Sequence, residues 1–198
     1  MLISVRRQLA FLAMPKTGTT AVEQSLAPLC EIVFGGRPDV KHMNLRGFQR
    51  FMLPYLETVG AGDVETVCVV REPVDWLSSW FRYRSRPALD GTPKSTKGMD
   101  FARFIEGYLE RPQPAFARTE SMSHFVSDRK ERPAVTHLFR YDRMDGLVAF
   151  LSARFRKEIS LATVNVSPRV EASLPKALRA RLEVERADDF AIYQDRAR

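Results

Sequence analysis

QLAFLAMPKTGTT, residues 8–20, decides the fold of this chain. It predicts a short apolar strand, then a turn with Pro, Lys and Gly, then a helix over residues 21–26. The free N–H groups of a first helical turn point towards a ligand, and the helix macrodipole adds roughly half a positive charge there. Lys16 adds a full cation, and Gly18 lets the backbone approach the ligand closely. Three hydroxyl groups can donate hydrogen bonds, those of Thr17, Thr19 and Thr20. The stretch therefore predicts a phosphate or sulfate site.

Two familiar anion-binding motifs do not fit these residues. The phosphate loop of nucleoside triphosphatases requires G-x-x-x-x-G-K-[ST], whereas here Lys16 precedes Gly18 and no earlier Gly exists. The K-T-G of β-lactamases requires S-x-x-K and S-D-N earlier in the chain, and only 15 residues precede Lys16. Residues 15–20 instead resemble the 5′-phosphosulfate loop of sulfotransferases that use 3′-phosphoadenosine 5′-phosphosulfate (PAPS).

A second strand–loop–helix unit strengthens this resemblance. Residues 67–70 form a β-branched run typical of a buried strand, and residues 74–84 have a helical pattern in which Pro73 suits the first position. Arg71 ends the strand, and Ser79 lies about two turns into the helix. This arrangement resembles the family's 3′-phosphate loop. The resemblance implies that Arg71 and Ser79 bind the 3′-phosphate of the cofactor.

Composition indicates an ordinary globular protein. The 198 residues suffice for one domain, 1–198, and the hydrophobic content of 44% is typical of a folded chain. The net charge of +7 suits an anionic cofactor or substrate, although an Arg-rich proteome explains it equally well. No motif of a nucleic-acid-binding protein is present. Two cysteines imply no disulfide framework, and no apolar run reaches the ~18 residues of a membrane span, so we expect a cytoplasmic protein.

Strand and helix patterns alternate along the chain. After the opening unit, we expect strands over residues 30–34, 66–70, 135–141 and 159–166. We expect helices over residues 74–84, 120–126, 142–155 and 174–193. Asn44 and Asp100 are expected to cap the starts of two more helices, and Pro54 should kink or end the first of these two. This alternation predicts an α/β fold, a three-layer sandwich with a mostly parallel central sheet of four or five strands. The resemblance implies the P-loop-like sulfotransferase form of that fold. Ligands then bind at the carboxyl ends of the strands.

Sulfuryl transfer requires in-line positioning, charge stabilisation at the leaving phosphate and a base for the acceptor's proton. Lys16 is the candidate for stabilising the leaving phosphate. His42 follows Lys41 where many sulfotransferases have a Lys and a catalytic His, and imidazole accepts protons near neutral pH. The resemblance therefore favours His42 as the base. No metal is required, and no group of His, Cys and Asp residues has the spacing of metal ligands.

Alternatives for the base remain open. Glu23 and Glu72 are possible because some sulfotransferases use a Glu, whereas His124 and His137 suit packing or structural roles better. Residues 85–98 are polar and rich in Pro and Gly, and they form either a lid over the acceptor or a plain solvated connection.

Two further residues are carried over by the resemblance. Tyr141 ends a strand that resembles the family's Tyr-Glu-Asp segment and would contact adenine, although Asp142 replaces the Glu. Residues 165–169 resemble a late Asn-x-Ser segment, in which Arg169 would add a contact to the 3′-phosphate. The long basic cofactor loop of cytosolic aryl sulfotransferases is missing. Its absence favours the compact bacterial and carbohydrate-type branch.

The sequence thus predicts a PAPS-dependent sulfotransferase that acts on a small-molecule or carbohydrate acceptor and releases 3′-phosphoadenosine 5′-phosphate (PAP). Two alternatives remain. A nucleotide-kinase-like phosphotransferase would require magnesium and a Walker loop. A non-catalytic module that binds PAP or PAPS would tolerate replacement of His42. The acceptor and the oligomeric state are open.

Overall fold

The computed structural model describes residues 1–162 and 173–197, and it is an α/β structure built on one mixed sheet. The five strands lie in the order β3-β1-β2-β4-β5. Their bounds are Ile32–Val33, Leu2–Ser4, Leu9–Leu12, Glu65–Val70 and His137–Arg140, respectively. The three strands β2, β4 and β5 are mutually parallel, whereas β1 runs antiparallel to both of its neighbours. The parallel pairing of β2, β4 and β5, with helices around the sheet, confirms the predicted α/β class and its mostly parallel central strands.

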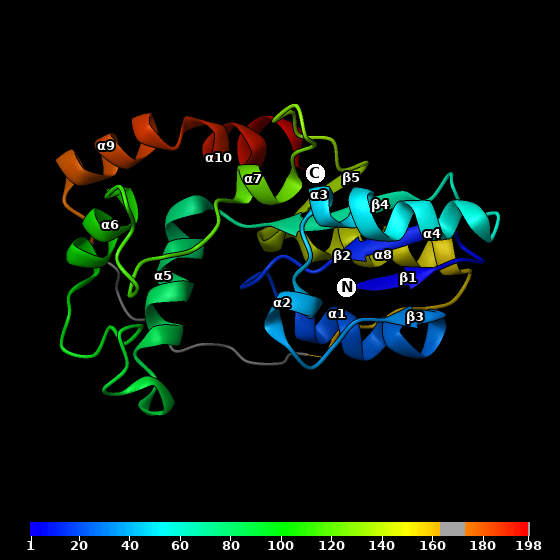
Figure 1. The fold of residues 1–198 in the computed structure, drawn as a ribbon, viewed down its shortest axis with the longest axis horizontal. Coiled ribbons are helices and arrows are strands. Elements are labelled where there is room, and N and C mark those ends of the chain that lie inside the picture. Colours follow the sequence, from blue (N-terminus) through cyan, green and yellow to red (C-terminus); the bar gives the residue numbers. More distant parts are fainter. Residues whose placement is uncertain (163–172, 198) are drawn as a thin grey trace.

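Side-chain alternation along the strands builds a core on each face of the sheet. On one face, Phe11, Val67 and Val69 pack with helices α1 (Thr19–Leu26) and α8 (Met144–Phe155). On the other face, Ala10, Leu12, Cys68 and Val70 pack with a larger group of helices. These are α3 (Leu45–Gly47), α4 (Leu53–Thr58), α5 (Pro73–Arg84), α6 (Phe101–Leu109), α7 (Met122–Val126), α9 (Lys176–Glu185) and α10 (Ala187–Ala191). Helices therefore surround the sheet on both faces (Figure 1).

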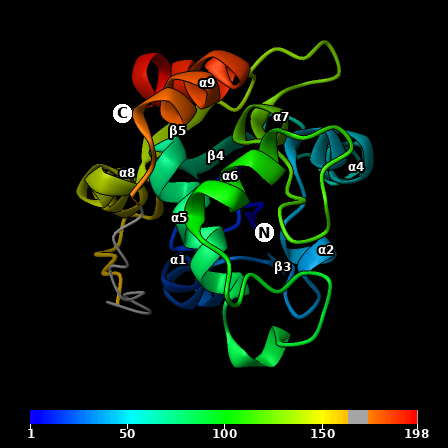
Figure 2. The same cartoon turned by 90° about the vertical axis from the view of Figure 1, so that its left-hand side faces the viewer.

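Helices α5 and α6 extend the molecule beyond one end of the sheet. Figure 1 shows them to one side of the strands, and Figure 2 shows them in front of the sheet when that side faces the viewer. Pro73 occupies the first turn of α5, and the Glu72 carboxylate caps the helix by accepting from the Asp75 N–H at 2.7 Å. Because β4 runs directly into α5, the carboxyl ends of the parallel strands face these helices.

Several expectations about the elements require correction. The N-terminal strand β1 was not expected, and no strand covers residues 159–162; the rest of the predicted strand over 159–166 lies outside the described residues. Pro54 does not end its helix, because a π-helical segment, η2 (Phe48–Met52), runs directly into α4; the kink at Pro54 stays a prediction. The wider turn of a π-helix accommodates a helical Pro that lacks an N–H.

The two helix caps that the sequence indicated are present. The Asn44 side chain accepts from the N–H of Gly47, and the Asp100 side chain accepts from the N–H of Arg103. The predicted tail helix over 174–193 is divided instead. Arg186 has φ −128° and ψ 31°, which ends α9 and starts α10, and a π-helical turn over Ile192–Arg196 follows.

Candidate functional site

The loop between β2 and α1 has two residues in the left-handed region of the backbone. Lys16 has φ 69° and Gly18, the N-cap of α1, has φ 72°. The N–H groups that open α1 have no acceptor within the helix and so remain available for an anion. The Thr17 hydroxyl was predicted to donate to a bound anion, and the structure contradicts this. It is buried and donates to the Met14 carbonyl at 2.9 Å, so it holds the loop and its hydrogen is not available to a ligand.

Arg71 joins the two predicted phosphate loops. Its Nη1 donates to the Lys16 carbonyl at 3.1 Å, and its Nε donates to Asp75 Oδ2 at 2.5 Å. The first loop is also tied to α5, because Trp76 Nε1 donates to the Pro15 carbonyl at 2.9 Å. The two strand–loop–helix units therefore form one connected structure at the carboxyl ends of β2 and β4.

Tyr141 covers the junction of the two loops. The Arg71 guanidinium lies 4.4 Å from the centre of the Tyr141 ring, and a Cβ added at Gly18 would lie 3.0 Å from Tyr141 Cε2. A side chain at position 18 would have to displace this ring and would adopt a strained positive φ, so glycine suits the position. The structure thus places Tyr141 beside both loops, although the prediction that it contacts adenine stays a prediction.

Helix α5 carries the predicted residue Ser79, and sequence reasoning missed other residues in and after this helix. Ser79 is buried, and helical spacing places it on the same face as Asp75 and Arg82. Tyr83 lies under two cations, with Lys16 Nζ at 4.5 Å and Arg86 Cζ at 4.8 Å from its ring centre. Arg82 follows Ser79 by three residues in the helical pattern, a spacing from which it could have been found. Arg86 lies beyond the end of α5, and only the tertiary structure brings it to Tyr83.

Positive charge is concentrated around Lys16. Burial, together with the neighbouring charges of Arg86, Arg71 and Arg82, lowers the pKa of Lys16 to about 8. An anion placed among these cations offsets the repulsion and stabilises the protonated amine, so it raises the pKa of Lys16 again. The donor set therefore fits a ligand with several negative charges.

His42 lies next to the first loop, at the C-cap of α2 (Pro38–Lys41). Its Nδ1 is 2.6 Å from the Ala13 carbonyl oxygen, which can only accept, so Nδ1 carries the proton and Nε2 is free to accept one. Burial lowers the pKa of His42 below its usual 6.5. At neutral pH the ring is therefore uncharged, as a general base requires.

The other candidate bases have roles in the fold. Glu23 pairs with Lys41 at 2.6 Å, and the Glu72 carboxylate caps α5. His124 pairs with Glu120 at 2.8 Å and His137 with Glu65 at 3.0 Å. These contacts leave His42, which is held at the Ala13 carbonyl just before the first loop, as the remaining candidate base.

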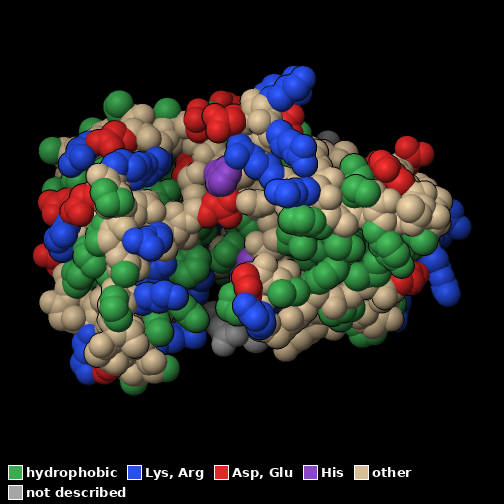
Figure 3. All heavy atoms as spheres, viewed as in Figure 1, with side chains coloured by type: hydrophobic (Ala, Val, Ile, Leu, Met, Phe, Trp, Pro, Cys, Tyr) green, Lys and Arg blue, Asp and Glu red, His purple; other side chains and the backbone are tan. Residues whose placement is uncertain are grey.

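The surface between α5 and the rest of the molecule is hollowed. Figure 3 shows a groove there, with Lys and Arg side chains gathered on the side that carries α5 and α6. The segment 85–98 folds back onto α5, because the buried Thr96 donates its hydroxyl to the Phe81 carbonyl at 2.8 Å. Whether the segment is a lid or a plain connection stays a prediction. Arg169 lies outside the described residues.

Within residues 1–162 and 173–197, no group of three or more His, Cys, Asp or Glu side chains could hold a metal ion. In the same ranges, no helix is long and apolar enough to cross a membrane. Comparisons of the chain with protein-family models, with curated proteins and with solved structures return no match.

Proposed function

We propose that the chain is a sulfotransferase that moves a sulfuryl group from PAPS to a hydroxyl or amine acceptor, with a saccharide favoured. The observation that carries the proposal is the junction of the two phosphate loops. Arg71 reaches the Lys16 carbonyl at 3.1 Å, and Tyr141 lies against both Arg71 and Gly18. Two anion-binding loops tied together in this way suit a nucleotide with phosphate groups at two positions.

Each residue takes a role that its position supports. Lys16 and the N–H groups of residues 18–20 would hold the 5′-phosphosulfate and stabilise charge on the leaving phosphate. Arg71 and Ser79 would hold the 3′-phosphate. The unprotonated Nε2 of His42 would take the acceptor's proton as the new O–S or N–S bond forms. The acceptor hydroxyl would approach from the groove beside α5 (Figure 3).

The cytoplasm is the compartment that we propose for this reaction. Cys30 and Cys68 are both free thiols, and Cys68 is buried in β4. Proteins of oxidising compartments more often use their cysteines in disulfides.

Calorimetric titration of the purified protein with PAP, AMP and ATP tests the nucleotide specificity. We expect micromolar binding of PAP without magnesium, and much weaker binding of AMP and ATP. Arg71→Ala should weaken PAP binding by about 2 to 3 kcal/mol, the scale of a lost charge-assisted contact, and should hardly affect AMP, which lacks the 3′-phosphate. A preference for ATP with magnesium would instead support the kinase alternative.

Transfer of labelled sulfonate from PAPS to a panel of saccharides and phenols tests the enzymatic step. Lys16→Ala should remove most turnover while the fold survives, since Lys16 serves the leaving phosphate and not the core. A Lys16→Ala variant with a near-native rate would reject that role. Tight PAP binding without transfer to any acceptor would support the non-catalytic module.

A further inference from the structure

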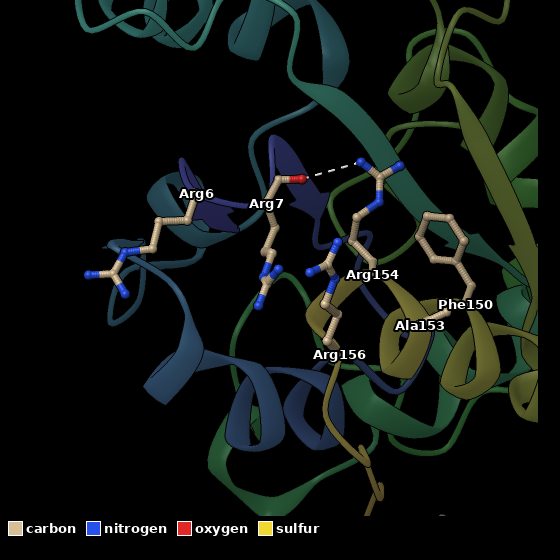
Figure 4. Close-up of a pocket in the computed structure, with 6 residues that line it drawn as sticks. All are labelled: Arg6, Arg7, Phe150, Ala153, Arg154 and Arg156. Carbon is tan, nitrogen blue, oxygen red and sulfur yellow. Dashed lines mark hydrogen bonds between the residues drawn. The ribbon is translucent and has the colours of Figure 1, made fainter.

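A second basic pocket lies at the opposite end of the sheet from the phosphate loops. It has a volume of about 460 Å³ and is lined by Phe150, Ala153 and four arginines, Arg6, Arg7, Arg154 and Arg156 (Figure 4). Arg6 and Arg7 precede β2, whereas the first phosphate loop follows it. Arg154 and Arg156 lie at the C-terminal end of α8. Two segments far apart in the chain thus bring four guanidinium groups to one hollow.

Two of these arginines have partners that fix their positions. Arg154 pairs with Glu65, and its Nη1 donates to the Arg7 carbonyl at 3.2 Å. Arg7 Nη2 donates to the Phe155 carbonyl, the last residue of α8, at 3.0 Å. The negative end of a helix dipole favours nearby cations, and this interaction accounts for Arg7. Because that partner is a carbonyl, the charge of Arg7 is not neutralised by a carboxylate.

The fold does not explain why an arginine occupies position 156. It has φ 53° at the C-cap of α8, a position where Gly or Asn is usual and where any other residue is strained. Its guanidinium makes no hydrogen bond or ion pair with the part of the chain that the structure describes. Figure 4 shows the Arg156 and Arg7 side chains reaching into the same space, whereas Arg6 extends away from it.

The charges and the size of the pocket define the ligand. Glu65 balances Arg154, and Glu31 lies 3.4 Å from the Arg6 Nε at an exposed site. Arg7 and Arg156 therefore leave about two positive charges in the pocket without a carboxylate among the described residues. Guanidinium groups bind phosphate and sulfate through paired N–H donors, and a volume of this size is typical of small-molecule sites. The Phe150 ring adds an apolar wall.

We infer that this pocket binds a small molecule that carries two or more phosphate or sulfate groups. The inference does not depend on the proposed function, because the pocket and the phosphate loops lie at opposite ends of β2. The ligand would sit between β1–β2 and the end of α8, where its oxyanion groups meet Arg7 and Arg156.

Inorganic diphosphate is a suitable probe. We would titrate it into ¹⁵N-labelled protein at constant ionic strength and follow the amide signals by nuclear magnetic resonance. Amide signals of residues 6–8 and 153–157 report on the pocket, and those of residues 16–20 report on the first phosphate loop. We expect saturable shifts of the pocket signals, and none with acetate. Absence of saturable shifts at the pocket would overturn the inference. Absence at residues 16–20 alone would weigh against the proposed function and leave the pocket intact.

Arg156→Gly separates ligand binding from folding. Gly adopts φ 53° without strain, so the Tm should be unchanged or higher, whereas diphosphate binding at the pocket should weaken about tenfold, the effect of one lost charge-assisted contact. Arg156→Gln removes the charge while keeping the side chain and should weaken binding equally. Arg129→Gln, at an exposed arginine that does not line the pocket, is the matched control and should bind normally.

Wild-type affinity in both Arg156 variants would overturn the inference. A sedimentation assay with phosphatidylcholine vesicles, with and without a phosphoinositide, distinguishes the source of the phosphate groups. Sedimentation that depends on Arg156 would assign the ligand to a lipid headgroup of the same chemistry. No sedimentation, together with diphosphate binding, would assign it to a free small molecule.

Discussion

Raising the pH from about 7 to about 9 should weaken PAP binding to the protein, because the free protein loses the Lys16 proton in this range. Burial, together with the charges of Arg86, Arg71 and Arg82, lowers the pKa of Lys16 from 10.5 to about 8. A bound polyanion counters those charges, so the pKa of Lys16 in the complex returns towards its ordinary value. Binding then requires a protonated amine that the free protein increasingly lacks.

The magnitude follows from the two pKa values. At about pH 9, roughly one tenth of the free protein carries a protonated Lys16, whereas the complex is still protonated. The observed affinity should therefore fall about tenfold between pH 7 and pH 9. The sign is that of a group whose pKa is raised on binding. The complex takes up a proton within the window from about pH 8 to 10.5.

Isothermal titration calorimetry in two buffers of different ionisation enthalpy measures both the affinity and the proton uptake. Lys16→Arg is the matched control, because a guanidinium keeps its charge across this range and its affinity should not fall with pH. Any change in the ligand's own ionisation appears equally in the control. An affinity of the wild-type protein that is constant to about pH 9, without proton uptake, would show that Lys16 does not meet the bound anion.

Three further predictions test the site and the fold around it. Gly18→Ala should lower the free energy of unfolding by about 1 kcal/mol or more and weaken PAP binding, because φ is 72° and an aromatic ring lies against the residue; Gly35→Ala, in open space, should be nearly neutral in the same denaturation and titration experiments. His42→Gln should lower kcat about a hundredfold or more, and the wild-type pH profile of kcat/KM should have an acid limb below pH 6.5 that this variant lacks. Arg84→Met should lower the free energy of unfolding in urea by roughly 3 kcal/mol, since the buried guanidinium donates to two carbonyls of the segment after α6, at 2.5 Å and 2.6 Å; full stability in urea would refute that role.

Local patterns predicted the elements that local interactions stabilise. The apolar run before Lys16, the Pro at the start of α5 and the caps at Asn44 and Asp100 all form as expected. The π-helical turn before Pro54 was not predicted, since such a turn leaves no simple signal in the sequence. Short-range hydrogen bonding and backbone preference determine such features, and both are visible in neighbouring residues.

Strand pairing could not be predicted in the same way. The three residues of β1 are too few for a periodic pattern, and only pairing with β2 and β3 makes them a strand. Conversely, residues 159–162 read Ile-Ser-Leu-Ala, a largely apolar run, but pair with no strand among the described residues. A strand is stabilised by its neighbours, which lie elsewhere in the chain.

The sequence by itself determined two strand–loop–helix units, each with a cation where an anion would bind, and a histidine, His42, that lies between them in the chain. Only the tertiary structure decided that these parts meet. Parallel pairing of β2 with β4 brings Arg71 to the Lys16 carbonyl, and the turn after β5 places Tyr141 over Gly18. The folded chain also brings His42 Nδ1 to the Ala13 carbonyl and gathers Arg71, Arg82 and Arg86 around Lys16. Motifs follow from residue order, whereas the lowered pKa values of Lys16 and His42 follow from burial and from charges that the folded chain brings together.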